Sequence, residues 1–283
     1  MTSAVRIGLS TWLLVCSAAQ TPKAREIRMN PAQVADRVKH QDWDILGVPG
    51  LFGPEAAPAL LPLLNDPNAQ VRELAVKCLD QAGGPDAKRG LLKALHDNNE
   101  LVRATASRLL VRHVTPADVA AIRPELAVGR DEYIREQLAL LIGRIGNQGE
   151  IAYLAQRHAF EKDAHAKHAI TLARARLGDQ VSKGEYVKTL YDADPMKRAV
   201  ALADLLYLED RGLVPSVLPL LDDDRPAKNV GPSHGPYFIR VCDVAINTLD
   251  QMLGHPFPFA TGFMTRYSPQ QIGQAKAVLA SVR

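Results

Sequence analysis

The sequence has few aromatic residues, few cysteines and little net charge. Aromatic side chains make up 5% of its 283 residues, cysteine occurs three times, and 34 Lys and Arg residues nearly balance 31 Asp and Glu residues. A net charge of +3 lacks the clustered basicity with which proteins neutralise nucleic-acid phosphates, so we expect no nucleic-acid partner. Alternating β-branched runs of strand length are also missing, which excludes a fold built on sheets.

The residues that are abundant favour packed helices. Hydrophobic residues make up 47% of the chain and charged residues 23%, which is the balance of helix pairs that pack through Leu, Ala and Val. The chain is longer than one typical domain, yet no Ser/Gly/Pro linker or charged run divides it. An array of repeats explains this combination better than several separate domains.

The first residues differ from the rest of the chain. Arg6 precedes an apolar run over residues 7–15, and small residues follow up to Ala19. This order predicts that residues 1–19 are a secretory signal peptide and that the mature protein is periplasmic or secreted. Two alternatives are a lipid anchor on Cys16 and a cytoplasmic protein whose apolar start packs on the first repeat. No later stretch reaches the ~20 apolar residues of a membrane-spanning helix, so we expect none in the mature protein.

Residues 57–83 show the repeating unit most clearly. A Pro-containing helix over 57–64 leads to a turn with Asp66, and a Val-Arg pair that ends at Arg72 opens a second helix, which stops before Gly83. The second helix has apolar residues at spacings of one, three and four, which is the pattern of a helix that packs one face against a core. Gly83 supplies the C-terminal stop.

The same pattern returns at a fixed period. The arginine recurs at Arg103 and Arg135, 31 and then 32 residues after the one before. Two further units are more degenerate and are identified by spacing, with Lys167 and Lys197 in the place of the arginine. A period of this length predicts stacked two-helix repeats. The sequence therefore predicts an all-α fold.

The last unit repeats the first but contains an insertion. Residues 214–223 match the first unit at a shift of 157, whereas the second helix, 241–254, matches it at a shift of 170. The difference predicts a long loop at 224–238 without secondary structure of its own, and such loops inside compact arrays are usually functional or disordered. The loop holds charged and aromatic groups that can grip a partner. These candidate binding residues are Arg225, Lys228, His234, Tyr237 and Phe238.

By the proline in the first helix, the Asp in the turn and the Val-Arg pair, the chain resembles the HEAT-repeat family over about residues 54–254. The resemblance implies an α-solenoid of about six two-helix repeats, a curved scaffold that holds partners. It also implies a ladder between neighbouring repeats, built from the turn Asp and the Arg. The ladder residues would be Asp66, Arg72, Asp97, Arg103 and Arg135. Lys167 and Lys197 put the ladder in doubt in the fourth and fifth units.

Both ends differ from the repeats and are expected to be caps. Residues 30–53 contain a helix start at Asn30 and predict a cap over the first repeat. Residues 255–283 hold half of the six Phe residues and a capping box that starts at Ser268. The aromatic residues of this C-terminal cap either fill the space under its helix or are exposed to a partner.

No constellation of residues predicts catalysis or metal binding. His158, His165 and His168 form the only His-rich stretch, but the sequence shows no closed set of ligands around them, so we expect neither a metal nor a cofactor. Cys242 and His234 have the residue types of a thiol nucleophile and its base, but no motif relates them. The sequence therefore predicts that the chain is not an enzyme.

These observations favour a non-catalytic scaffold or adaptor that binds another protein on its concave surface. The first alternative is a HEAT-like enzyme, of the DNA glycosylase or the pigment lyase type, because both kinds are found among HEAT-like solenoids. A second alternative is an accessory subunit whose insertion docks on a neighbouring enzyme. We expect a monomer or a weak oligomer.

The signal peptide makes a prediction about the native N-terminus. If the leader is removed after Ala19, N-terminal sequencing of the protein from its own host should begin near Gln20, because small residues precede the cleavage site of secretory signals. An intact Met1 on protein from the soluble cytoplasm would contradict export.

Overall fold

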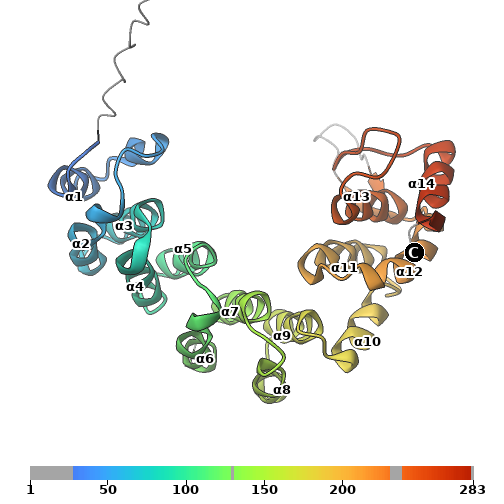
Figure 1. The fold of residues 1–283 in the computed structure, drawn as a ribbon, viewed down its shortest axis with the longest axis horizontal. Helices are drawn as coiled ribbons and strands as arrows, with labels where there is room; N and C mark the ends of the chain where they lie inside the picture. Colours follow the sequence, from blue (N-terminus) through green and yellow to red (C-terminus); the bar gives the residue numbers. More distant parts are fainter. Residues whose placement is uncertain (1–27, 129–130, 230–237, 282–283) are drawn as a thin grey trace, which may run out of the picture.

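The computed structural model describes residues 28–128, 131–229 and 238–281, and these residues form a curved array of helices (Figure 1). The array runs from α1 through α7 to α13 and α14 and encloses an open concave side. The predicted signal peptide, residues 1–19, lies outside the described residues, and the periplasmic or secreted location stays a prediction. No helix within the described ranges is long and apolar enough to cross a membrane.

Successive pairs combine an outer helix with an inner helix that faces the concave side (Figure 1). The inner helices are α3 (Ala69–Ala82), α5 (Glu100–Leu110), α7 (Glu132–Ile145), α9 (Ala164–Arg176), α11 (Pro195–Leu208) and α13 (Val241–Leu253). The outer elements are η2 (Pro54–Ala56), α2 (Ala57–Leu60), η3 (Leu61–Asn65), α4 (Gly84–Ala94), η4 (Pro116–Asp118), α6 (Val119–Val128), α8 (Glu150–Phe160), α10 (Gln180–Thr189), η5 (Arg211–Leu213), α12 (Val214–Val217) and η6 (Leu218–Asp222). The remaining elements are α1 (Pro31–Lys39), η1 (Trp43–Gly47), β1 (Pro226–Asn229), β2 (Phe238–Arg240) and α14 (Pro269–Ser281). The predicted α-solenoid is confirmed.

The outer helices of the first and last pairs are broken, whereas the sequence predicted one continuous helix over 57–64. The structure divides this segment into one α-helical turn and the 3-10 helix η3, and a further 3-10 helix, η2, precedes it. Pro58 and Pro62 each remove a backbone donor and crowd the preceding turn, which explains the break. Pro215 and Pro219 divide the last outer helix in the same way.

The inner helices α3 to α11 begin at equivalent residues, each capped by a short polar side chain. The Oδ1 atom of the cap accepts a hydrogen bond from the backbone N–H two residues ahead, which satisfies one of the free donors of the first turn. The cap residues of α3, α5, α7, α9 and α11 are Asn68, Asn99, Asp131, Asp163 and Asp194. They recur every 31 or 32 residues, so the period read from the sequence is the period of helix starts.

Arg72 connects its own turn to the turn of the next pair. Its Nε and Nη2 atoms donate to the two carboxylate oxygens of Asp97 at 2.7 and 2.8 Å, and Nη1 donates to the carbonyl of Asp66 at 2.8 Å. The side chains of Arg72 and Asp97 are both buried. The Asp66 carboxylate instead accepts from the N–H of Asn68 at 2.8 Å, so Asp66 takes part in this contact only through its backbone.

The next two contacts use carboxylates that the sequence analysis did not assign. Arg103 donates to Asp131 at 2.9 Å, because the position that corresponds to Asp97 is a glycine in this unit and the helix cap takes its place. Arg135 donates from Nε and Nη2 to Glu161 at 2.8 and 3.0 Å. The hydrogen bond from Arg135 lowers the pKa of Glu161 to about 2.

The register predicted for the fifth unit is wrong by one residue. The predicted equivalent of Arg72 was Lys197, but the residue at this position is Arg198, which follows Lys167 by 31 residues. Arg198 donates to the carbonyl of Asp192 at 2.5 Å and to the carboxylate of Asp223 at 2.8 Å. Within the described residues the Lys167 ammonium has no carboxylate partner. The ladder is therefore interrupted after α9 and resumes at α11.

The interruption coincides with a change in the core. One hydrophobic cluster extends from α1 to Leu177, and a second starts at Leu172 and extends to α14. Tyr207 of α11 reaches across α9 and donates its hydroxyl to the carbonyl of Leu140 in α7 at 2.7 Å. Gly143 makes room for it, since a Cβ there would lie 2.1 Å from the Tyr207 hydroxyl and 2.6 Å from the Cα of Ala173.

The insertion forms a hairpin, and not the loop without secondary structure that the sequence predicted. β1 and β2 pair antiparallel, with Asn229 opposite Phe238. Ala227 and Ile239 are buried, so the base of the insertion belongs to the second core. The strands are only four and three residues long, too short to show an alternating pattern in the sequence.

The C-terminal segment covers α13. Its aromatic residues were expected either to fill the space under its helix or to be exposed, and the structure shows both cases. Phe257 and Tyr267 are buried, whereas Phe263 is exposed. The Tyr267 backbone N–H donates to the buried carboxylate of Asp243 at 2.9 Å, and Arg240 also donates to Asp243, at 2.7 Å from Nη2. These contacts close the C-terminal end of the array.

Removal of Arg72 should destabilise the protein far more than removal of an exposed arginine. In Arg72→Gln the buried carboxylate of Asp97 loses its cation, for which a loss of about 3 kcal/mol in unfolding free energy is the usual scale. In Arg89→Gln, which breaks an exposed pair with Asp86 at 2.9 Å, the loss should stay below about 1 kcal/mol. Urea unfolding measures both, and equal losses would contradict a stabilising ladder.

Candidate binding surface on the inner helices

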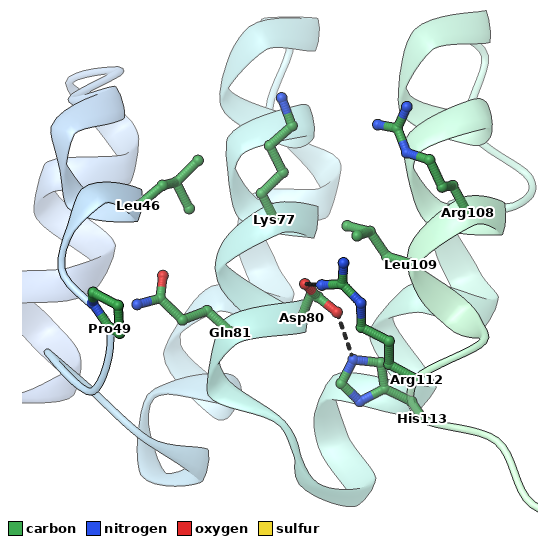
Figure 2. A pocket seen from close by; sticks show the side chains of 9 residues that line it. All are labelled: Leu46, Pro49, Lys77, Asp80, Gln81, Arg108, Leu109, Arg112 and His113. Carbon is green, nitrogen blue, oxygen red and sulfur yellow. Dashed lines mark hydrogen bonds and ion pairs between the residues drawn. The ribbon is translucent and has the colours of Figure 1, made fainter. Parts of the chain in front are cut away.

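An open groove lies between η1, α3 and α5 on the inner helices (Figure 2). Its volume is about 510 Å³. Cationic side chains stand around an apolar base, so the groove suits a ligand with both an acidic and an apolar part. The lining residues are Leu46, Pro49, Lys77, Asp80, Gln81, Arg108, Leu109, Arg112 and His113.

Asp80 neutralises one side of the groove. Its carboxylate contacts Arg112 Nη1 at 2.6 Å and His113 Nε2 at 2.9 Å (Figure 2). Lys77 contacts Glu73 at 2.7 Å and lies 4.6 Å from the centre of the Trp43 ring.

Arg108 is the exception in the groove. It is exposed in the last turn of α5, and no hydrogen bond or ion pair joins its guanidinium to the rest of the described chain. The groove therefore keeps a positive charge that the fold does not use.

Arginines recur near the carboxyl ends of successive inner helices. Arg112, Arg144 and Arg176 follow each other at 32 residues, and each stands nine residues after the ladder position of its helix. Arg144 and Arg176 lie in the last turns of α7 and α9, and Arg112 follows the end of α5 by two residues; we call these three residues the arginine row. Cations are favourable near helix carboxyl ends, where the helix dipole is negative.

The members of the arginine row differ in how they are bound. Arg176 donates a hydrogen bond to the carbonyl of Tyr207. It also donates to the Glu209 carboxylate at 2.8 Å, and this second hydrogen bond lowers the pKa of Glu209. Arg144 is exposed and lies 6.0 Å from the centre of the Tyr207 ring. Among the described residues Arg144 makes no hydrogen bond or ion pair. Arg144 and Arg108 are therefore available to a ligand.

Large apolar side chains recur near the amino ends of three inner helices, α5, α7 and α11, whereas the corresponding residue of α9 is His165. The second residue of α5 is Leu101, that of α7 is Tyr133 and that of α11 is Met196. Leu101 is 58% exposed, Tyr133 38% and Met196 61%. We call these three residues the apolar row. Exposed apolar side chains at equivalent positions are typical of contact surfaces, whereas scattered ones need no explanation.

The three histidines of the His-rich stretch, which were weak candidates for metal ligands, have different surroundings. His168 contacts Asp204 of α11 at 2.8 Å, and this hydrogen bond raises the pKa of His168. Burial lowers the pKa of His158 on α8, and His165 is exposed at the start of α9. Among the described residues no three His, Cys, Asp or Glu side chains are placed to hold a metal ion.

Cys78 and Cys242 are both buried. Burial raises the pKa of the Cys78 thiol to about 12 and that of the Cys242 thiol to about 11. Both side chains are therefore thiols and not thiolates near neutral pH, and only the thiolate is a strong nucleophile. His234, the base considered for Cys242, lies outside the described residues.

The candidate binding residues of the insertion are only partly described. Arg225 uses its guanidinium within the fold, because Nε and Nη2 donate to Asp223 at 2.9 and 2.8 Å. Phe238 is exposed at the start of β2, and Lys228 lies in β1. His234 and Tyr237 lie outside the described residues. Of the predicted set within the described residues, Phe238 is exposed without a polar partner for its side chain, whereas Arg225 is partly exposed and bound to Asp223.

The net charge of the whole chain does not reveal the arginine row. A net charge of +3 hides a local surplus of cations, because carboxylates elsewhere in the chain balance it. The signal was present in the same period that revealed the repeats, since Arg112, Arg144 and Arg176 are spaced by 32 residues.

Comparison with known proteins supports the architecture. Residues 44–111 match the family model described as HEAT repeats. No curated protein matches the chain. Among solved structures, the chain is similar to a chain in the complex of CpcE and CpcF of phycocyanin lyase from Nostoc sp. PCC7120, with 18% identity and a TM-score of 0.49. The match covers 94% of this chain and 100% of that one.

The comparison corrects one prediction from the sequence. The prediction that the chain is not an enzyme is contradicted by the match to a chain of a lyase complex. That prediction rested on the lack of a recognisable catalytic motif, and it is withdrawn. At this identity and TM-score the similarity assigns no activity, substrate or partner to the present chain. The chain is an α-solenoid, and its residues 44–111 are similar to HEAT repeats.

Proposed function

We propose that the inner helices bind a protein partner, which lies across the apolar row and the arginine row. The observation that carries this proposal is the apolar row, Leu101, Tyr133 and Met196. These side chains are exposed at the same position of three inner helices, where they contribute little to the core. Their burial against a partner would contribute at roughly 25 cal/mol per Å² of apolar surface.

Two kinds of contact at opposite ends of the inner helices explain how such a surface can be specific. Apolar contacts supply affinity, while charged contacts orient the partner and exclude those of like charge. Arg108 and Arg144 offer guanidinium groups that the fold leaves unpaired among the described residues. Tyr133 and Arg144 are at the two ends of α7, about 16 Å apart along the helix axis. A partner that carries apolar and acidic groups at that separation would satisfy both rows. This role suits an adaptor, an accessory subunit or a subunit of an enzyme.

The insertion is the second candidate surface, because Phe238 is exposed on β2. We rank it after the inner helices, since Arg225 is occupied by Asp223 and by the carbonyl of Ala193 at 3.3 Å. An insertion that packs its base into the core needs those contacts for its own fold. Phe238→Ser leaves them unchanged and tests this surface alone.

Partner capture should depend on the apolar row and not on equally exposed apolar residues elsewhere. The variant Leu101→Ser with Met196→Ser removes two exposed contacts of the row. Its matched control is Phe160→Ser with Val181→Ser, on the outer helices α8 and α10, where the two side chains are 67% and 65% exposed. Each lost central contact costs more than 1 kcal/mol in a typical interface, so capture should weaken about tenfold or more.

The measurement is affinity purification of the tagged protein from its own host, with partners quantified by mass spectrometry. Thermal unfolding should be nearly the same for both double variants, because all four side chains are exposed. Equal capture by the row variant and by the unchanged protein would contradict the proposal. If Phe238→Ser alone abolished capture, the binding surface would be the insertion.

A further inference from the structure

We propose that Arg108 and Arg144 receive two carboxylates of an extended acidic segment of the partner, about three residues apart in that segment. This inference rests on the proposed function and names the chemistry of what is bound. It starts from the arginines near the carboxyl ends of the neighbouring inner helices α5 and α7, of which Arg108 and Arg144 are the exposed ones without a hydrogen bond or an ion pair in the described chain.

The cations on this part of the inner helices outnumber the carboxylates that contact them. Lys77 contacts Glu73, Arg112 contacts Asp80, and Arg176 contacts Glu209. Arg108 and Arg144 remain, both exposed and both without a hydrogen bond or an ion pair within the described residues.

Stabilisation of helix carboxyl ends accounts for Arg176, which donates to the carbonyl of Tyr207. It does not account for Arg108 and Arg144, because neither donates to a backbone carbonyl of the described residues, and the Arg144 guanidinium has only the Tyr207 ring as a neighbour, at 6.0 Å. An anionic ligand that lies along the row is the natural partner for these two guanidinium groups, since Arg presents a planar fork of donors that matches a carboxylate.

The spacing of neighbouring helices sets the spacing of the ligand charges. Axes of packed helices lie about 8–10 Å apart, and an extended chain advances about 3.3 Å per residue. Arg108 and Arg144 lie on the neighbouring inner helices α5 and α7, so their carboxylate partners should be about three residues apart in an extended segment.

A protein segment fits the surface better than a nucleic acid does. The carboxylates of Asp80 and Glu209 are bound to Arg112 and Arg176. They would repel a phosphate backbone, which carries a charge at every residue, more than a peptide whose carboxylates lie only opposite Arg108 and Arg144. Nucleic-acid grooves of this kind also stack bases on aromatic side chains. Tyr207, the aromatic residue that Arg144 and Arg176 contact, is half-buried and already holds these two guanidinium groups at 6.0 and 5.2 Å from its ring centre.

The test uses two fluorescent peptides of the same composition, one with Glu at every third residue and one with the same Glu residues in a single block. Fluorescence anisotropy at low salt should show that the spaced peptide binds about tenfold more tightly than the block peptide. A charge-assisted hydrogen bond contributes on the scale of a tenfold change in affinity. Arg108→Gln and Arg144→Gln should each weaken the spaced peptide about tenfold.

The control variant is Arg89→Gln, which removes an exposed arginine from the outer helix α4 and should leave peptide affinity unchanged. The inference would be overturned if both peptides bound equally well. It would also be overturned if Arg89→Gln weakened peptide binding as much as Arg144→Gln does. Tighter binding of a single-stranded oligonucleotide of equal charge would overturn it as well.

The outcome separates this inference from the proposed function. If neither peptide binds while partner capture still depends on Leu101 and Met196, the acidic segment is wrong and the inner helices remain the binding surface. If the spaced peptide binds through Arg108 and Arg144 but capture ignores Leu101 and Met196, the apolar row is wrong and the arginine row stands.

Discussion

A single buried contact, between an arginine at the start of an inner helix and the turn of the next pair, sets the geometry of this solenoid. Arg72 holds the carbonyl of Asp66 in its own turn and the carboxylate of Asp97 in the next. The contact sets the distance from one helix pair to the next. Neither buried charge can be removed alone, because an unpaired buried charge destabilises the folded state. Residues 31 or 32 apart are consequently placed at equivalent positions on successive helices, and this placement turns isolated side chains into rows.

The solenoid changes where this contact is missing. Lys167 stands in the ladder position of α9, and the two hydrophobic clusters meet at the same helix. The neighbouring helices are joined there by other means: Tyr207 reaches the carbonyl of Leu140, and His168 contacts Asp204. Gly143 permits the close approach. The arginine row spans α5 to α9 and therefore belongs to the first cluster, whereas the apolar row continues onto α11 and the second.

The sequence alone reveals the repeat period of 31 or 32 residues well, because the Val-Arg pair and the starts of the inner helices recur with it. The register of the fifth unit was misassigned because Lys197 and Arg198 are adjacent cations, and only the contact with Asp223 distinguishes them. The hairpin of the insertion escaped notice because its strands are too short to show a pattern. The candidate surface was missed because Arg108 and Arg144 are significant only once neighbouring helices show that nothing pairs with them.

The central claim is that a partner contacts the inner helices. Site-specific photo-crosslinking in the host tests it most directly, with the reactive group at Ala104, between the two rows on α5, or at Gly184 on the outer helix α10, where a side chain meets open space. The account predicts a crosslinked partner of defined mass from position 104 and none from position 184. The same product from both positions, or from 184 alone, would contradict it.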